Sequence, residues 1–173
     1  MKTSGAVAPS SRFLVDKMLN EINFSKAELI VELGPGNGKI TKKILSKLNS
    51  KAMLICFEIN NHFYQELQKI NHPQLIVLNK SAEAVKEELE KLGYIKSCHI
   101  ISSLPLANIP KTISDNILQK SYASLSEEGT FIQYQYSLTY FKKLKKVFNQ
   151  SISLDFEMLN LPPAFIYRCK KVV

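Results

Sequence analysis

The chain has 173 residues, a formal net charge of +8 and a hydrophobic content of 45%. This length suits one domain with a sizeable core, so we expect a single domain over residues 1–173. No run reaches the roughly 18 apolar residues of a membrane-spanning helix, and residues 1–11 lack the apolar stretch of a secretory signal. The three cysteines and three histidines are scattered, so we expect reduced thiols, no bound metal and a cytoplasmic protein.

The positive charge comes almost entirely from lysine, since only Arg12 and Arg168 among 23 basic residues are arginines. A lysine-rich surface favours polyanions and does not decide between nucleic acid and an anionic membrane. Four lysines gather within residues 142–146, on a helix expected over 141–148. They would add salt-sensitive attraction to a bilayer, unless they are simply a solvated helix face.

Helical and strand patterns alternate along the chain, which predicts an α/β protein with helices on both faces of a mostly parallel sheet. In chain order, helices are expected over 11–22, 39–48, from Asn60 or Asn61 onward, 82–92, 113–125 and 141–148. Strands are expected over 29–33, 52–58, 74–78, 98–101, 129–136, 152–159 and 165–170. Cys56 and Cys98 fall within strands, and we expect both to be buried.

A glycine-rich turn follows the first predicted strand and reads Glu32-Leu33-Gly34-Pro35-Gly36-Asn37-Gly38. Alternating glycines permit positive φ and let a ligand lie against the backbone. Lys39 stands where the dinucleotide fingerprint needs its third glycine, and the G-K-[ST] ending of a P-loop is missing. The pattern resembles motif I of class I S-adenosylmethionine-dependent methyltransferases, in which the acid at position 32 holds the amino-acid end of the cofactor. A glycine turn that serves only structure is the alternative.

A second carboxylate ends the second predicted strand at Glu58, twenty residues after Gly38. In a β-α-β unit this residue and Glu32 face the same crevice at the carboxyl ends of neighbouring strands. A carboxylate there can accept both hydrogens of a ribose diol. An acid that merely favours the following helix N-terminus is the alternative.

The methyltransferase resemblance implies a Rossmann-like fold of seven mostly parallel strands, with the last two adjacent, and S-adenosylmethionine as the cofactor. Many class I enzymes contact the adenine amino group with an acid after the third strand. Here residues 79–82 read Asn-Lys-Ser-Ala, so Ser81 or a backbone group must serve. The cofactor contacts implied by the resemblance are Ser11, Glu32, Gly34, Gly36, Asn37, Gly38, Glu58, Ile59, Ser81, Ala82 and Ser102.

Four further segments narrow the family. They are Gly5-Ala6-Val7-Ala8-Pro9-Ser10-Ser11-Arg12, Ile100–Leu106, Gln133-Tyr134-Gln135-Tyr136 and Asn160-Leu161-Pro162-Pro163-Ala164-Phe165-Ile166-Tyr167-Arg168. Together they resemble the bacterial phospholipid N-methyltransferases, over nearly the whole chain. Those enzymes convert phosphatidylethanolamine stepwise toward phosphatidylcholine, so the resemblance implies a head-group amine as the substrate.

The layout is also similar to the ribosomal RNA adenine dimethylases, which carry N-[LI]-P-[YF] after the fourth strand. This chain has Ser103-Leu104-Pro105-Leu106 there, which offers neither a side-chain amide nor an aromatic ring for a flipped base. Those enzymes also carry a further C-terminal helical domain. We therefore expect a lipid amine rather than RNA adenine as the substrate, with an RNA adenine N-methyltransferase as the alternative. A third hypothesis is a catalytically silent fold that binds nucleic acid or membrane, against which the intact acids and glycines argue.

For the chemistry, we expect a neutral amine to attack the sulfonium methyl in line, with the enzyme aligning the reactants. Burial lowers the pKa of an amine, and a tyrosine, carboxylate or water can accept its proton. Tyr136 is the first candidate for positioning the amine, with a half-buried core tyrosine as the alternative. The backbone carbonyls of Ser102 and Leu104 are candidate acceptors, and we expect their side chains to matter little.

Membrane contact is expected to be peripheral and reversible, at the cytoplasmic face, by a monomer. Residues 1–25 are expected to form a lid, with Arg12 and Phe13 in the membrane-contacting helix, unless Phe13 packs in the core. Arg12 and Arg168 are candidates for a lipid phosphate or the cofactor carboxylate, because a guanidinium matches such groups well. A structural ion pair is the alternative for each.

Overall fold

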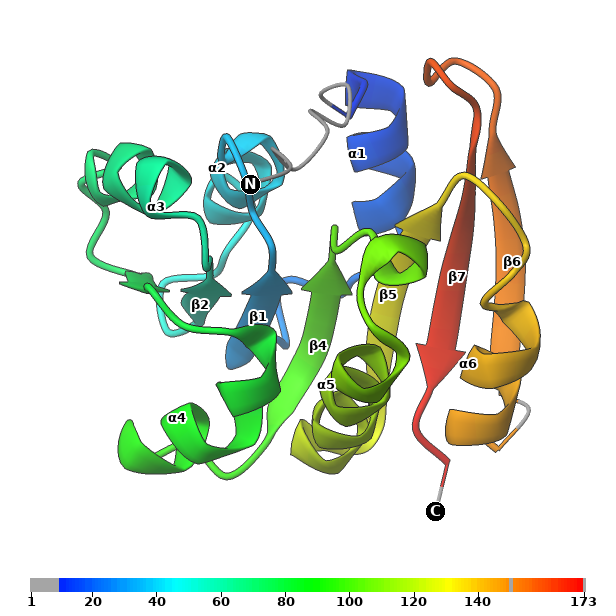
Figure 1. Cartoon of the computed structure of the whole chain (residues 1–173). Helices are drawn as coiled ribbons and strands as arrows, with labels where there is room; N and C mark the ends of the chain where they lie inside the picture. Colours follow the sequence, from blue (N-terminus) through cyan, green and yellow to red (C-terminus); the bar gives the residue numbers. More distant parts are fainter. Residues whose placement is uncertain (1–9, 150, 173) are drawn as a thin grey trace.

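The computed structural model describes residues 10–149 and 151–172 and shows one seven-stranded sheet between two layers of helices (Figure 1). The strands are β1 (Leu29–Leu33), β2 (Met53–Phe57), β3 (Leu75–Leu78), β4 (Ser97–Ser102), β5 (Leu125–Gln135), β6 (Ile152–Glu157) and β7 (Ala164–Lys170). Their order is β3-β2-β1-β4-β5-β7-β6. β1 to β5 are parallel, and β7 lies antiparallel between β5 and β6. This confirms the Rossmann-like methyltransferase fold predicted from the sequence.

The helices are short and begin at side-chain caps where the sequence supplies them. They are α1 (Arg12–Leu19), α2 (Lys39–Leu45), α3 (Asn61–Gln68), α4 (Val85–Lys91), α5 (Lys111–Ser124) and α6 (Phe141–Val147), with 3-10 turns η1 (Ala82–Ala84) and η2 (Leu106–Asn108). Ser11 caps α1 and Asn60 caps α3, each by accepting backbone N–H bonds from the first turn. In the described part of the chain, no helix has both the length and the apolar character needed to cross a bilayer.

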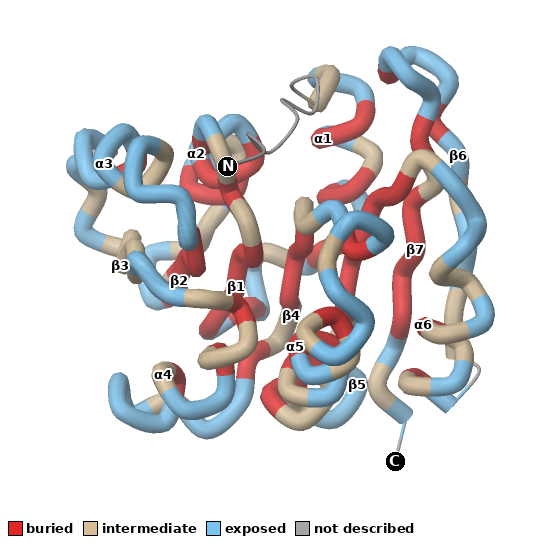
Figure 2. The backbone as a smooth tube through the Cα atoms, in the orientation of Figure 1, coloured by how far each residue is buried: buried red, intermediate tan, exposed pale blue. Residues whose placement is uncertain are grey.

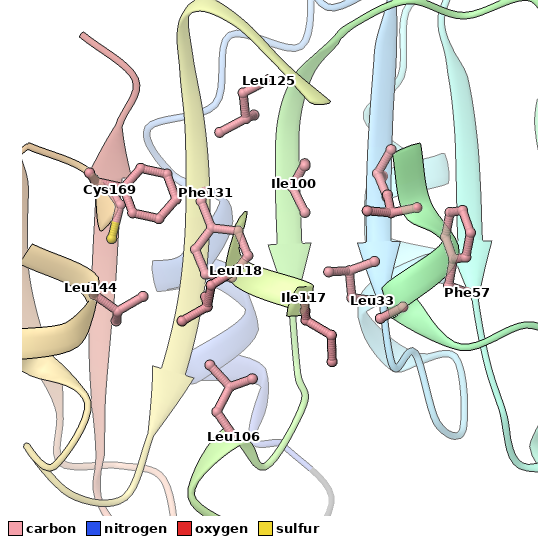
Figure 3. Packing of buried hydrophobic residues seen from close by; sticks show 14 of the residues in the cluster. Leu33, Phe57, Ile100, Leu106, Ile117, Leu118, Leu125, Phe131, Leu144 and Cys169 are labelled. Carbon is pink, nitrogen blue, oxygen red and sulfur yellow. The ribbon is translucent and has the colours of Figure 1, made fainter. Parts of the chain in front are cut away.

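The core has two parts, one on each face of the sheet, because parallel strands are buried on both sides. All five residues of β1 are buried (Figure 2). On one face, Leu14 of α1 and Ile44 of α2 belong to one apolar cluster. On the other, Leu118 of α5, Leu144 of α6 and Phe131 of β5 belong to a second cluster (Figure 3). The two layers fix the strands and hence the loops at their carboxyl ends.

Several predicted boundaries are wrong. β5 begins at Leu125 rather than 129, because pairing with β4 resumes beyond an irregularity between Ser97 and His99. The helix expected over 82–92 is split into η1 and α4, since Ser81 caps a short 3-10 turn first. α1 ends at Leu19, before 22. Cys98 is half-buried rather than buried, whereas Cys56 has the expected burial.

The carboxyl ends of β1, β4 and β5 meet at one edge of the sheet, the upper edge in Figure 1. Leu33 of β1 is in register with Ser102 of β4, which is in register with Gln133 of β5. The loops after these strands are therefore neighbours, as a crevice at this edge requires. Residues 5–9 of the N-terminal motif lie outside the described residues.

Candidate active site

The glycine turn after β1 has three residues with positive φ, and they serve different purposes. A Cβ at Gly34 would lie 2.7 Å from Leu104 Cδ2, and one at Gly38 would lie 2.9 Å from Leu67 Cδ2. Both glycines therefore let neighbouring segments pack against the turn. At Gly36 (φ 54°) no described atom lies within 4 Å of the same position. Gly36 alone leaves an open backbone face for a ligand.

Glu32 lies inside the sheet and is fully buried. Its Oε2 accepts hydrogen bonds from Thr41 Oγ1 at 2.7 Å and from Cys56 Sγ at 3.4 Å. Its Oε1 is buried and has no hydrogen-bond partner among the described residues. Burial raises the pKa of Glu32 to about 7, against the lowering effect of the two donors. A buried acceptor without a donor favours a cationic group, because an ammonium would complete its hydrogen bonding and stabilise its charge.

Glu58 lies directly beyond β2 and is almost completely buried. Its Oε2 accepts from the N–H of Gly36 at 3.0 Å, and its Oε1 accepts from the N–H of Asn60 at 2.8 Å. Each carboxylate oxygen keeps a further lone pair, so the group can still accept from two adjacent hydroxyls. The bond to Gly36 also places this carboxylate beside the open backbone face of the turn. This geometry fits the expected ribose contact.

The expected adenine end of the site lies after β3. Ser81 Oγ accepts from the N–H of Glu83 at 3.2 Å and caps η1, which leaves its hydroxyl proton free to donate. The Asn79 side chain, which sequence reasoning did not assign, donates to the carbonyl of Glu58 at 2.8 Å and joins the ends of β2 and β3. Ile59 is 72% exposed here, and Ala82 is buried. An exposed apolar side chain beside Glu58 is suited to cover a flat ring.

The segment after β4 is held by bonds that correct one prediction. The carbonyl of Leu104 accepts from Gln133 Nε2 at 3.0 Å and from Gln135 Nε2 at 3.2 Å. Both lone pairs are thus in use, so this carbonyl is not a free acceptor for a substrate amine. The Leu104 side chain packs against Gly34 and so has a structural role in the turn. Ser102 is buried, and its Oγ accepts from the N–H of Leu104 at 3.4 Å.

A cavity of about 220 Å³ opens beside this segment. It is lined by Ser103, Leu104, Pro105, Ala107, Asn108, Tyr134, Gln135, Tyr136 and Ser137. The hydroxyls of Tyr136 and Ser103, and Oε1 of Gln133 nearby, are buried atoms that make no hydrogen bond within residues 10–149 and 151–172. Burial, with the Tyr134 phenol close by, raises the pKa of Tyr136. Two lining residues, Tyr136 and Ser103, thus supply neutral hydroxyls without partners in the described chain, of the kind that can orient an amine.

The N-terminal end of α1 closes over this region. Ser10 Oγ donates to the hydroxyl of Tyr134 at 3.3 Å, and the N–H of Ser11 donates to Asn160 Oδ1 at 2.8 Å. Lys39 Nζ, at the start of α2, donates to the carbonyl of Ser10 at 2.5 Å. The Ser11 hydroxyl is engaged in capping α1, accepting from Leu14 at 3.1 Å. Asn160 and Lys39 were missed in the sequence because their partners lie far away along the chain.

The two arginines have different environments. Arg12 is exposed at the first position of α1, with its guanidinium 4.8 Å from the ring centre of Phe13. Phe13 is 39% exposed, so it does not pack in the core. Arg168 is 7% exposed and donates to the carbonyl of Lys17 at 2.6 Å and to Asn20 Oδ1 at 3.1 Å. It also pairs with Glu21 and Asp155.

Arg168 is therefore a structural residue, which corrects its assignment to substrate phosphate. The residue stands opposite Ile132, three positions below the end of β5, and its guanidinium ties β7 to the end of α1. The ion-pair alternative from the sequence is the one that the contacts support.

Across the described ranges, no group of three or more His, Cys, Asp and Glu residues could hold a metal ion. Asn37, the remaining residue of the turn, is exposed, and its Oδ1 accepts from Lys39 N at 3.3 Å.

Comparison with known sequences places this geometry among methyltransferases. A model of the ribosomal RNA adenine dimethylase family matches residues 10–150. An ornithine lipid N-methyltransferase from Singulisphaera acidiphila is 27% identical over 96% of this chain and 88% of that protein. The ribosomal RNA small subunit methyltransferase A of Ureaplasma urealyticum is 29% identical over 72% of this chain, but only 44% of that protein is covered.

Solved structures support the fold. The N-methyltransferase NodS from Bradyrhizobium japonicum superposes with a TM-score of 0.70 at 8% identity, covering 92% of this chain and 94% of that one. A protein assigned as an S-adenosylmethionine-dependent methyltransferase from Listeria monocytogenes gives 0.68 at 12% identity, covering 91% and 97%. At such identities the likeness concerns the fold alone.

Proposed function

The chain belongs to the ribosomal RNA adenine dimethylase family of class I methyltransferases, and from this premise we propose that it methylates the head-group amine of a membrane lipid. Its enzyme class, an S-adenosylmethionine-dependent methyltransferase, follows from the family and the fold. The substrate is our inference, with phosphatidylethanolamine and ornithine lipid as the two amines to compare.

The residues around the glycine turn fit the cofactor. S-adenosylmethionine supplies a methyl group on a positively charged sulfur, which an amine can attack. Glu32 has a buried oxygen ready for the α-ammonium group, and its ionised form gains stability when that cation binds. Glu58 can accept the ribose hydroxyls while Gly36 leaves room beside it. These residues bind and orient, which is the main contribution an enzyme makes to an in-line displacement.

The substrate amine is oriented, in this proposal, by the cavity after β4. The phenol of Tyr136 is neutral near pH 7, as an ordinary tyrosine is, and burial raises its pKa further. It can therefore accept a hydrogen bond from the amine. Ser103 Oγ and Gln133 Oε1 are further buried acceptors without partners in the described chain. Removal from water favours the neutral amine, which is the form that attacks. The Leu104 carbonyl contributes indirectly, because two glutamines fix the turn that carries it.

The single observation that carries the lipid proposal is the character of residues 103–106. Leu106 is fully buried and Ser103 has only a hydroxyl, so this segment provides no aromatic face and no amide for an adenine base. The ornithine lipid relative supports the same conclusion, since the match covers 88% of that protein. Methylation of RNA adenine is the second candidate, favoured by the family model itself.

Membrane contact in this proposal is peripheral, by a monomer at the cytoplasmic face, and uses the surface near α1. Arg12 and Phe13 are exposed there, beside the bonds that close α1 over the cavity. The lysine-rich helix α6 is less suited. Lys143 is paired with Asp115, and α6 lies toward the end of β7 remote from α1 (Figure 1).

The test is transfer of labelled methyl from S-adenosylmethionine to three substrates: phosphatidylethanolamine vesicles, ornithine lipid vesicles and unmethylated ribosomal RNA. We expect label in one or both lipids and none in RNA. Glu58→Ala removes the ribose acceptor and should abolish transfer, whereas Glu90→Ala, an exposed change on α4 away from the turn and from η1, should retain it. Counting mono-, di- and trimethylated products gives the number of transfers.

Label in RNA alone would show that the character of residues 103–106 does not select the substrate and would refute the lipid proposal. If S-adenosylhomocysteine binds but neither lipid nor RNA is labelled, the cofactor site stands and the lipid proposal is wrong. Failure to bind S-adenosylhomocysteine at all would favour the catalytically silent alternative.

A further inference from the structure

The connection between β6 and β7 exposes an unusual set of apolar side chains. Residues 158–163, which we call the hairpin tip, read Met-Leu-Asn-Leu-Pro-Pro and contain no charged residue. Met158, Leu159 and Leu161 are 72%, 62% and 80% exposed. Single exposed leucines are common, but three large apolar side chains within four residues form a patch that suggests a partner.

The hairpin tip is held in place by defined contacts. Asn160 is almost fully buried within it, and its Nδ2 donates to the carbonyl of Pro162 at 2.7 Å. Its Oδ1 accepts from Ser11 N at 2.8 Å. The N–H of Leu159 donates to Glu157 Oε1 at 2.8 Å. These bonds turn the polar groups of the tip inward and leave the apolar side chains facing out.

The hairpin tip adjoins the mouth of the candidate active site. Both lie at the upper edge in Figure 1, where the tip stands next to the start of α1. Hydrogen bonds link them in a chain, from Asn160 to Ser11 and, through the neighbouring Ser10, to Tyr134 in the cavity wall. A surface that bound the tip would therefore lie against the entrance to the cavity.

The charges around the hairpin tip indicate the chemistry of that surface. Arg12 and Lys39 are exposed cations on the same rim, since Lys39 bonds Ser10 and Arg12 follows Ser11. The nearby acids are paired: Glu157 and Asp155 each lie 3.5 Å from Lys17 Nζ. The apolar tip is uncharged and is bordered by cations that pair with no acid among the described residues. It therefore matches an anionic bilayer, whose acyl region accepts leucine and whose surface attracts basic residues.

We propose that the hairpin tip inserts into the interfacial region of an anionic lipid bilayer and holds the mouth of the cavity against it. The inference rests on the proposed lipid function and adds the element that brings the enzyme to its substrate. A bilayer suits a narrow projecting tip because it surrounds the inserted side chains. A protein partner needs a broad complementary face of about 800 Å².

The direct test uses the fact that the chain contains no tryptophan. Leu161→Trp places one at the tip, and Ile95→Trp places one at a site that is 81% exposed between α4 and β4, at the opposite end of the sheet. Vesicles contain phosphatidylethanolamine and phosphatidylglycerol, with bromine on the acyl chains. We expect blue-shifted and quenched emission for Leu161→Trp and unchanged emission for Ile95→Trp. Equal behaviour of the two variants overturns the proposal.

A second pair of variants separates docking from chemistry. Leu159→Ser with Leu161→Ser should reduce vesicle binding in a sedimentation assay at least about tenfold, because two exposed apolar anchors are lost. The same variant should keep its turnover on a short-chain, monomeric form of the amine lipid, and Ile95→Ser should change neither measurement. Tip-dependent vesicle binding without methylation of any lipid refutes the proposed function and leaves insertion standing. If the double variant is active and its vesicle binding is not reduced, insertion of the hairpin tip is refuted and the proposed function stands.

Discussion

At the scale of single residues, the hydrogen bonding of buried polar atoms distinguishes side chains that stabilise the fold from side chains that can bind a ligand. Glu32 and the half-buried Tyr136 each have a buried oxygen without a partner in the described ranges. Arg168 leaves only its Nε without a hydrogen bond there, and that atom forms an ion pair with Glu21. The guanidinium of Arg168 is bonded to backbone and side chains of the α1 region. The same rule that makes an unpaired buried acceptor costly makes it a strong point of attachment.

Glu32 should make stability depend on pH. Its pKa rises from 4.5 to about 7 on folding, because burial favours the protonated form. The folded state therefore binds this proton more tightly. Its contribution is complete below pH 4.5 and is lost as pH rises through about 7. Relative to Glu32→Gln, the cofactor-free protein should lose about 3 kcal/mol of unfolding free energy across this window. Urea unfolding at a series of pH values tests this, and parallel curves would contradict it.

Arg168→Lys should destabilise the protein without a direct effect on catalysis. A lysine cannot reproduce the bonds from the guanidinium to Lys17 and Asn20, so we expect a loss of about 1–3 kcal/mol. Thermal unfolding measures the loss. Arg12→Lys, an exposed change, is the control and should leave the melting temperature unchanged. A stable Arg168→Lys protein with reduced turnover on lipid would restore the phosphate role.

At the scale of elements, the site is built where three loops are pinned to one another. The turn after β1 accepts the Leu104 side chain against Gly34, while the turn after β4 is fixed by two glutamines of β5. The Glu58 carboxylate after β2 bonds the N–H of Gly36. Each loop is short and conformationally restricted, so the ligand-binding groups are pre-positioned by packing of the strands below.

Gly36→Ala should weaken cofactor binding, and Gly93→Ala is the control because it should lose the same amount of stability. Gly36 and Gly93 both have positive φ, and no described atom lies within 4 Å of the Cβ position at either site. Alanine should therefore cost about 1–2 kcal/mol of stability at each of them. Only at position 36 does the methyl group occupy the expected cofactor face. Titration calorimetry with S-adenosylhomocysteine should show binding at least about tenfold weaker for Gly36→Ala, a loss of about 1.4 kcal/mol. Equal affinities for the two variants would contradict this placement.

At the scale of the whole molecule, the position of the positive charges decides which surface an anionic membrane attracts, more than the net charge does. The net charge of +8 spreads over many lysines, but α6 and the start of α1 lie at different ends of the sheet (Figure 1). A membrane that meets the upper edge would come close to Arg12 and Lys39, while the lysines of α6 would stay in solvent. Attraction between surface charges falls off within a distance of about 10 Å at ordinary salt.

We therefore expect Lys142→Gln with Lys146→Gln to bind anionic vesicles as well as the unchanged protein does. Arg12→Gln should bind about fivefold more weakly, since one basic residue near an anionic surface contributes about 1 kcal/mol. Sedimentation with phosphatidylglycerol-containing vesicles at low and high salt checks both. Weaker binding by the α6 variant alone would mean that the membrane meets the other end of the molecule.

The sequence by itself determined the alternation of strands and helices, the glycine turn and the two carboxylates, because these depend on local spacing and burial. Where β5 begins and how far α1 extends depend on pairing and packing with remote segments, so those boundaries differed from the prediction. Only the tertiary structure decided that Arg168 is tied to α1, that two glutamines occupy the Leu104 carbonyl and that Asn160 holds the N-terminus of α1. Each of these contacts joins residues far apart along the chain, and a linear pattern carries no signal for which donor will meet which acceptor.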